Sequence, residues 1–304
     1  MEAGCRLHRP PHMRFFANVP IERLTCLPQR FYCKLGGMNS VEAHYAQPGL
    51  LERVRAALLA SGLNPDQLEQ ADLAKFDQFH VGGLDATNRL ARMAAIRRSD
   101  RVLDLGSGTG GPSRHLAATL GCHVTGLDLT TEFIEVATML ARATGLSHLL
   151  SYRQGDALRP PFEDGSFDVV WTQHASMNIE DKGSLYREIF RLLKPGGRLA
   201  LHDVLAGTGV VRYPVPWARR PELSFLISGE DMRSALEAAG FRELALDDVT
   251  REGTEALRQV AARAGGPGLG IQTFMGPEFP GMVANLVANL EGGACRLVQA
   301  AYAN

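Results

Sequence analysis

The chain has 304 residues, a formal net charge of -1, 45% hydrophobic residues and 21% charged residues. This length fits one large α/β domain or two small ones, and the near-zero charge argues against a nucleic-acid partner, which would leave a basic footprint. The five cysteines form no CxxC pair, which argues against a zinc site or a disulfide framework and favours a reducing cytoplasm, and we expect no metal site. No apolar run approaches the ~20 residues that span a bilayer.

Residues 1–37 differ from the rest of the chain in composition. They are rich in arginine and proline, contain only Glu2 and Glu22 as acids, and have no apolar stretch typical of a secretory signal. We expect either a disordered leader or a mis-assigned start upstream of Met38. An organelle transit peptide is a further alternative, because such peptides are rich in arginine and poor in acids.

Helical patterns follow. Apolar residues at helical spacing predict a helix that starts near Pro48 and ends at Ser61-Gly62, then helices over residues 68–76 and 84–96. Between the last two lies the segment 76–83, with aromatic residues, His80 and the pair Gly82-Gly83. Paired glycines allow a ligand to approach the backbone closely, although a plain turn between helices is an equal alternative.

Strands and helices then alternate with short connections. Strands are predicted over residues 101–105, 123–127, 149–154, 167–172, 198–205, 243–249 and 295–302. Helices are predicted from Pro112, from Thr130 or Thr131, over 182–193, from Ser228 to Gly240, and over 252–264 and 282–291. This alternation predicts a mainly parallel, doubly wound α/β sheet. In such sheets ligands bind at the carboxyl ends of the strands.

The stretch VLDLGSGTGG, residues 102–111, is the most informative of the chain. A buried strand, closely spaced glycines and a helix that begins at Pro112 are typical of the first crossover of a βαβ unit. The start of that helix favours a negatively charged or strongly hydrogen-bonding ligand. The glycine pattern alone does not distinguish a dinucleotide from another adenosine cofactor.

Three carboxylates narrow the choice. Asp128 follows the second strand and can accept two hydrogen bonds from ribose hydroxyls, although a helix cap is the alternative. Asp156 can accept from an adenine amine while the N–H of Ala157 addresses the ring. Asp104 can bind a ligand ammonium or the N–H groups of the loop. S-adenosylmethionine, which joins a zwitterionic amino acid to adenosine, would use all three.

The chain also resembles a known family. VLDLGSGTGG, GLDLT (126–130), QGDA (154–157), FDVVW (167–171) and LLKPGG (192–197) resemble, in order and spacing, the motifs of class I S-adenosylmethionine-dependent methyltransferases. The closest likeness is to the small-molecule branch with sarcosine/dimethylglycine, tocopherol-type and ubiquinone/menaquinone methyltransferases. The resemblance implies a Rossmann-like, seven-stranded sheet with an antiparallel last strand, N-terminal helices and lid insertions. The resemblance also implies that residues 38–304 form one domain. Its parts are a helical cap (38–97), a core (98–250), and a lid with the last strand (251–304).

The family's cofactor-binding positions carry over to this sequence. The segment DQFH (77–80) with Gly82-Gly83 resembles the family's cofactor-covering segment. The resemblance also implies that the glycine loop faces the methionyl part and that Asp128 faces the ribose. Leu129 packs on the adenine, with plain core packing as its alternative, and Gln173 flanks the methionyl amine. The implied set is Gln78, His80, Gly82, Asp104, Gly106, Ser107, Gly108, Asp128, Leu129, Asp156, Ala157 and Gln173.

The acceptor is expected beyond the fourth strand. His174 is the candidate base or acceptor-orienting residue, with a backbone-bonded loop histidine as the alternative, whereas His202 inside a strand is more typical of a structural residue. The candidate acceptor-binding residues are Met177, Asn178, Tyr213, Trp217, Phe274 and Met275; the last four would form an apolar lid or else a subsidiary core. The few acids nearby favour an uncharged, partly apolar acceptor.

Two other functions stay open from the sequence. A nicotinamide-dependent oxidoreductase could use the same glycine loop, although no Tyr-x-x-x-Lys pair is visible. A non-catalytic cofactor-binding protein is the second alternative. We expect a cytoplasmic monomer or homodimer that acts on a small molecule.

Overall fold

A computed structural model describes residues 40–45, 47–73, 76–263 and 272–304, which belong to one compact unit, Met38–Asn304. The predicted leader, 1–37, and residues 265–271 of the glycine-rich loop lie outside the described residues. None of the helices described is both long and apolar enough to cross a membrane.

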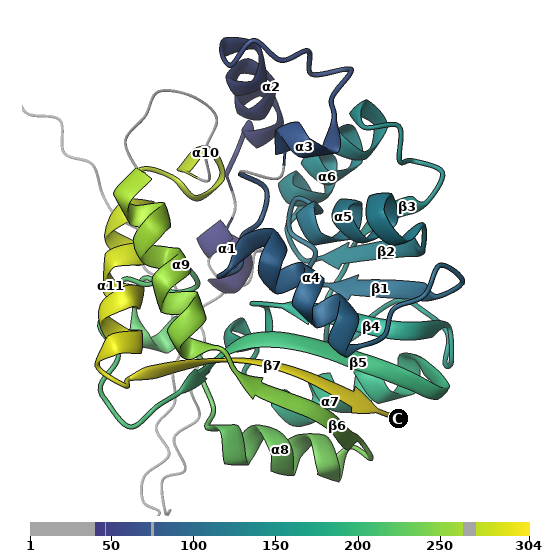
Figure 1. Cartoon of the computed structure of the whole chain (residues 1–304), viewed down its shortest axis with the longest axis vertical. Coiled ribbons are helices and arrows are strands. Elements are labelled where there is room, and N and C mark those ends of the chain that lie inside the picture. The colour runs from purple at the N-terminus through teal and green to yellow at the C-terminus, as the bar shows by residue number, and fades with distance from the viewer. Residues whose placement is uncertain (1–39, 46, 74–75, 264–271) are drawn as a thin grey trace, which may run out of the picture. The chain divides into compact units, whose positions relative to one another are not determined.

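One sheet organises the described chain (Figure 1). The strands are β1 Arg101–Leu105, β2 His123–Asp128, β3 Leu150–Gln154, β4 Phe167–Gln173, β5 Leu193–Ala206, β6 Arg242–Asp248 and β7 Cys295–Ala303. The helices are α1 Ser40–Tyr45, α2 Leu50–Ala60, α3 Gln70–Leu73, α4 Gly83–Met93, α5 Gly111–Leu120, α6 Thr131–Ala143, α7 Lys182–Leu192, α8 Gly229–Ala238, α9 Thr250–Arg263, α10 Gln272–Met275 and α11 Phe279–Glu291, with 3-10 turns η1 Ser176–Asn178 and η2 Pro221–Leu223.

The strand order places a crevice at the centre of the sheet. The order is β3-β2-β1-β4-β5-β7-β6, and β7 pairs antiparallel with both β5 and β6. From β1 the chain winds outward to β2 and β3, and from β4 it winds outward on the other side. Such a reversal leaves a ligand-binding crevice outside the carboxyl ends of β1 and β4. The predicted fold class, including the antiparallel last strand, is confirmed.

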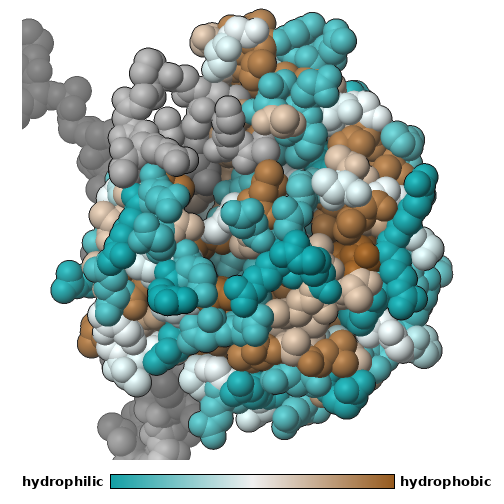
Figure 2. Space-filling model, viewed as in Figure 1, coloured by the Kyte–Doolittle hydropathy of each residue, from teal (hydrophilic) through white to brown (hydrophobic). Residues whose placement is uncertain are grey.

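Side-chain alternation along the strands builds a core on each face of the sheet. In β4, Val169 and Trp171 pack with residues of α4 and α5, whereas Val170 packs with residues of α7 and α8. All three side chains are fully buried, as is typical of a sheet covered on both faces. The surface seen in Figure 2 is largely hydrophilic, with smaller hydrophobic patches between.

Several predicted boundaries differ from the structure. The helix predicted over 68–76 is limited to α3, and the short helices α1 and α10 were not predicted. The KPGG sequence was predicted to be a helix stop, and α7 does end at Leu192, but the chain enters β5 at once, with Leu193 paired to Phe167. Gly196 adopts φ 76°, and the register shifts beside this site, so the turn is absorbed within the strand.

A buried ion pair joins the segment before α4 to the glycine loop. Arg114 of α5 donates to the Asp77 carboxylate over 2.8 Å, and both side chains are fully buried. Arg114 also donates to the backbone carbonyl of Thr109. A Cβ on Gly111 would lie 2.1 Å from the carbonyl oxygen of Asp77, so glycine is required where these two segments touch. The ion pair therefore fixes the base of the crevice.

Replacing Arg114 with Met should strongly destabilise the fold, because it leaves the Asp77 carboxylate buried without its cation. We expect the free energy of unfolding, measured by urea denaturation, to fall by about 3–5 kcal/mol. The matched control is Arg55→Met, which breaks the exposed pair with Asp66 and should cost at most about 1 kcal/mol. Equal losses in both variants would contradict the assignment.

Candidate active site

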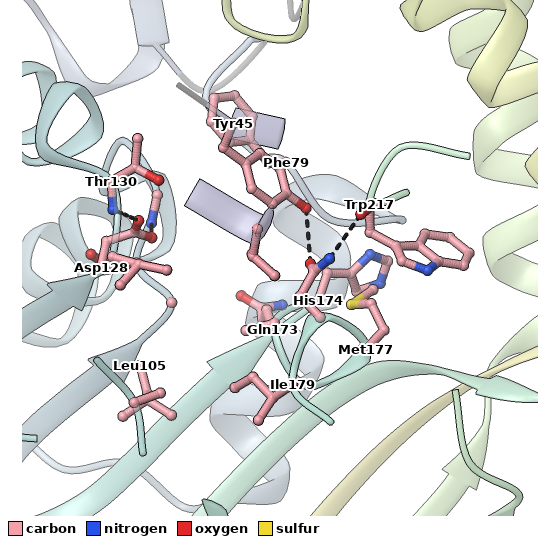
Figure 3. A pocket seen from close by; sticks show the side chains of 18 of the residues that line it. Tyr45, Phe79, Leu105, Asp128, Thr130, Gln173, His174, Met177, Ile179 and Trp217 are labelled. Atoms are coloured by element: carbon pink, nitrogen blue, oxygen red, sulfur yellow. Dashed lines mark hydrogen bonds between the residues drawn. The ribbon is translucent and has the colours of Figure 1, made fainter. Parts of the chain in front are cut away.

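A cavity of about 540 Å³ opens at the carboxyl ends of the central strands. Its volume is in the range of small-molecule sites. Figure 3 shows Asp128 and Thr130 on one side, Met177 and Trp217 on the other, and Gln173 and His174 between them. The sequence-predicted residues that line it are His80, Gly106, Ser107, Gly108, Asp128, Leu129, Asp156, Ala157, Gln173, His174, Met177, Asn178, Trp217 and Met275.

Three predicted cofactor-binding residues do not line the cavity. Asp104 is buried under the loop, where its carboxylate accepts from the Ser113 hydroxyl over 2.5 Å, so it faces the start of α5 instead of a ligand ammonium. Burial raises its pKa to about 7. Gln78 donates from Nε2 to Asp77, and Gly82 is the residue before α4, with φ 86°. These three residues support the glycine loop and α4 and do not line the cavity. Their positions therefore do not provide direct contact with a ligand.

Two predicted lid residues also lie away from the cavity wall. Phe274 is fully buried and stacks on Phe76, with ring centroids 6.0 Å apart. Tyr213 packs beside the apolar cluster around Val215 and Leu286. For these two residues the alternative of subsidiary core is the one that the structure shows.

The glycine loop is closely fitted to its surroundings. Gly106 and Gly108 have φ of 80° and 52°, a region that favours glycine. A Cβ on Gly106 would lie 2.5 Å from that of Ala175. The N–H groups of Gly106 and Ser107 both donate to the Leu127 carbonyl, at 2.8 and 3.1 Å. The Ser107 hydroxyl oxygen is buried and has no hydrogen-bond partner among the described residues.

Asp128 connects two backbone segments. One carboxylate oxygen accepts from the Gly108 N–H over 2.8 Å, and the other accepts from the Thr130 N–H over 2.9 Å (Figure 3). Burial raises the pKa of Asp128, and these backbone hydrogen bonds oppose that shift. A carboxylate has about four lone-pair sites, so two remain for a ligand in the cavity.

A group of three histidines lies at the floor between the two sides. The ring of His174 is 4.8 Å from that of His202 and 6.3 Å from that of His80. His174 has φ 52°, uncommon for a residue with a side chain, and its Nε2 is buried without a partner among the described residues. Burial, reinforced by nearby His80, lowers the pKa of His174 to about 3. His174 is therefore a neutral ring at physiological pH.

Hydrogen bonds hold Gln173 and His202 in fixed positions. The indole N–H of Trp171 donates to Gln173 Oε1 over 3.1 Å, and Gln173 Nε2 donates to His202 Nδ1 over 3.3 Å. Burial lowers the pKa of His202 well below its usual value. His202 is fully buried within β5 and supports Gln173, as expected of a structural residue.

Residues far apart in the sequence meet at the Trp217 side. The Tyr45 hydroxyl donates to Asn178 Oδ1 over 3.0 Å, and Asn178 Nδ2 donates to the Trp217 carbonyl over 2.8 Å (Figure 3). Sequence reasoning missed Tyr45, because a six-residue helix carries too little periodicity to be recognised. It also missed other lining residues, among them Val41, Thr130, Phe133, Ile179, Pro216 and Phe225, whereas Asp77 and Phe79 belong to the predicted cofactor-covering segment.

The charges at the cavity are all acidic. Among the described residues, no lysine or arginine lines it. Of the lining acids, Asp77 is paired with Arg114, and Asp181 caps α7 by accepting from the Ser184 N–H over 2.8 Å. Asp128 and Asp156 also accept backbone hydrogen bonds, so of the five lining acids Glu180 is the one whose exposed side chain has no partner among the described residues.

Comparisons with known proteins agree with this geometry. Residues 103–201 match the model of a family described as "Methyltransferase domain". A glycine/sarcosine/dimethylglycine N-methyltransferase of Actinopolyspora halophila is 34% identical over 185 residues, which cover 60% of this chain and 32% of the relative. A 27-O-demethylrifamycin SV methyltransferase of Amycolatopsis mediterranei is 31% identical over 169 residues, covering 54% of this chain and 62% of the relative.

The fold also matches solved structures. The crystal structure of the (4+2)-cyclase SpnF superposes with a TM-score of 0.61 at 24% identity, covering 84% of this chain and 94% of that chain. The chain spans about a third of the length of the first curated relatives that it matches. The ordered motifs, the sheet order and the matched domain together confirm the predicted family. Residues 103–201 therefore form a methyltransferase domain, and the chain is similar to S-adenosylmethionine-dependent methyltransferases that act on small molecules.

Proposed function

We propose that this protein transfers the methyl group of S-adenosylmethionine to an uncharged, partly apolar small molecule. The observation that carries the proposal is a single cavity that joins the glycine loop and Asp128 to an apolar wall around Trp217. A cofactor and an acceptor bound on these two sides would meet near Gln173 and His174, which lie between them.

The residues on the loop side suit the cofactor. Asp128 keeps lone pairs for the ribose hydroxyls, and Asp156 with Ala157 would address the adenine. Gly106 and Gly108 allow the methionyl part to approach the backbone. When bound, S-adenosylmethionine would supply an electrophilic methyl group on a sulfonium.

The same loop is poorly suited to the pyrophosphate of a nicotinamide dinucleotide. A pyrophosphate is bound by unsatisfied backbone N–H groups at such a turn. Here the N–H groups of Gly106 and Ser107 donate to Leu127, and that of Gly108 donates to Asp128. The loop is thus held by the protein itself, which favours the methyl donor over the dinucleotide.

The opposite wall favours an uncharged acceptor. It is built from Met177, Ile179, Trp217 and Phe225, and no cation of the described chain lines it to bind a phosphate. Of the two acids beside this wall, Asp181 is already used as the cap of α7, and Glu180 is exposed. An apolar molecule gains from burial here, whereas an anionic group would lose its hydration without a cationic partner.

His174 would orient the acceptor instead of acting as a strong base. Methyl transfer is an in-line displacement, which needs a positioned nucleophile and the exclusion of water. A ring with a pKa of about 3 is a weak base, but its lone pair can accept a hydrogen bond from the acceptor. The left-handed backbone at His174 supports a functional role, because such strain concentrates at active sites.

The proposal extends to the location, oligomeric state and partners of the protein. We place it in the cytoplasm as a monomer or homodimer that has no nucleic-acid partner. The net charge of -1 supports the lack of a nucleic-acid partner, and a sequence without a CxxC pair supports the cytoplasm.

The donor and the acceptor class can be tested together. Calorimetry should detect binding of S-adenosylmethionine and none of NAD, and the reverse result would contradict the proposal. Mass spectrometry should then find methylated products from phenols and not from their phosphate esters or from amines of the same carbon skeleton. A preference for the ester or the amine would refute the uncharged acceptor, and donor binding without any product would favour a non-catalytic protein.

Asp128→Ala should weaken S-adenosylmethionine binding by about 1–3 kcal/mol, the scale of lost hydrogen bonds to a charged group. The loss combines the ribose contact with the release of the Gly108 and Thr130 N–H groups. Calorimetry measures the effect. Asp164→Ala, which removes an exposed carboxylate outside the cavity, is the control and should leave the affinity unchanged. Wild-type affinity in Asp128→Ala would show that this carboxylate does not hold the cofactor.

His174 should stay neutral throughout the physiological pH range. Because burial lowers its pKa to about 3, protonation should begin only in strong acid. The NMR signals of labelled histidines, with His174 identified by their loss in His174→Gln, should not titrate between pH 8 and 5. Titration of that signal near pH 6.5 would contradict the buried environment and restore His174 as a candidate general base.

A further inference from the structure

The side chain of Lys182, the first residue of α7, is buried next to the cavity but does not line it. Its Nζ donates to three backbone carbonyls, those of Ser176 at 2.9 Å, Ile179 at 2.5 Å and Phe225 at 2.7 Å. A protonated amine has three N–H donors, so each is used on one carbonyl. Lys182 is thus fully occupied by the backbone.

The three carbonyls belong to two separate segments. Ser176 and Ile179 lie in and directly after the turn η1, which follows β4, whereas Phe225 lies in the irregular segment that follows β5. Ile179 and Phe225 both line the cavity on the acceptor side. Lys182 therefore joins the two segments that form the acceptor wall.

Two neutral hydrogen bonds link the same segments. The Phe225 N–H donates to the Met177 carbonyl over 2.8 Å, and Asn178 Nδ2 donates to the Trp217 carbonyl. Neither of these two hydrogen bonds involves the carbonyl of Ile179 or of Phe225. The Lys182 ammonium contacts both of those carbonyls and so connects them. A charged donor makes stronger hydrogen bonds than a neutral one, so Lys182 is the strongest link between the segments.

The charges around Lys182 are few. Asp203 of β5 is fully buried, accepts from the Ser176 N–H over 3.1 Å, and attracts the ammonium. Burial lowers the pKa of Lys182 to about 8, and Asp203 opposes that shift. Burial raises the pKa of Asp203 to about 6 and that of Tyr186, on the next turn of α7, further above its usual value. Between pH 8 and 9.5, Lys182 is the group of this set that loses its proton.

We infer that Lys182 is a positioning residue whose ammonium holds η1 against the segment after β5 and so sets the shape of the acceptor half of the cavity. This inference rests on the proposed function for the identity of that half. A neutral amine keeps only two N–H donors, so at least one of the three hydrogen bonds from Lys182 is lost when the proton leaves. The wall should therefore loosen as the pH rises through the pKa of Lys182.

Tryptophan fluorescence tests this without a known acceptor. The chain has two tryptophans, Trp171 in the core and Trp217 on the wall, and both are shielded from solvent. In the wild type, acrylamide should quench fluorescence weakly at pH 7 and more strongly by pH 9.5, with a midpoint near 8. Lys182→Met should be quenched strongly at every pH. A flat wild-type profile, or Lys182→Met that behaves like the wild type, overturns the inference.

Two variants sharpen the result. Lys182→Arg keeps a charge at all these pH values, so it should stay weakly quenched up to pH 9.5. Trp217→Phe should lose the pH response, which assigns the signal to the wall. If the response survives in Trp217→Phe, the change lies elsewhere and the inference fails.

Calorimetry separates this inference from the proposed function. Lys182→Met should bind S-adenosylmethionine like the wild type at pH 7, because Lys182 lies on the acceptor side. A large loss of affinity would mean a general structural role and overturn the inference. If the wild type itself binds no S-adenosylmethionine, the proposed function fails, while the quenching profiles still decide whether Lys182 holds the wall.

Discussion

The Asp128 carboxylate is the contact on which the glycine-loop side of the cavity depends. Its two oxygens accept from Gly108 in the loop after β1 and from Thr130 at the start of α6. Burial makes its charge costly, and the two backbone hydrogen bonds compensate for part of that cost. A carboxylate held in this way is oriented before a ligand arrives, so little further ordering is needed when one binds.

The Trp217 side, where we propose that the acceptor binds, is held by a different kind of interaction. Here two sets of contacts connect segments from distant parts of the sequence. One is the ammonium of Lys182, and the other is the chain of hydrogen bonds from Tyr45 through Asn178 to Trp217. These contacts use up polar groups within the protein, and the surface left to the acceptor is apolar. The Asp128 side of the cavity therefore offers directed polar contacts, and the Trp217 side offers an apolar surface of fixed shape.

The division explains what the sequence could predict. The fold, the glycine loop and Asp128 follow from local signals, because strand, turn and helix lie within a few residues and impose glycine at positions such as Gly106. The acceptor wall depends on long-range contacts. Tyr45 and Asn178 are 133 residues apart, and nothing in either neighbourhood predicts their hydrogen bond. Asp104 was placed at the site because it precedes the glycine loop, and Phe274 because it lies in an aromatic insertion, but both side chains are buried away from the cavity.

The histidines at the floor fit this division of the cavity. A fold of this kind hosts different reactions, as the similarity to a cyclase structure illustrates, so the site and not the sheet must carry the argument for chemistry. His80 and His174 have pKa values lowered to about 4 and 3, mainly by burial, so they add no positive charge beside the cofactor. A positive sulfonium would be repelled by imidazolium groups, whereas neutral rings leave its charge unopposed and can still orient a nucleophile. Neutral histidines are therefore compatible with methyl transfer, whereas protonated histidines would repel the sulfonium.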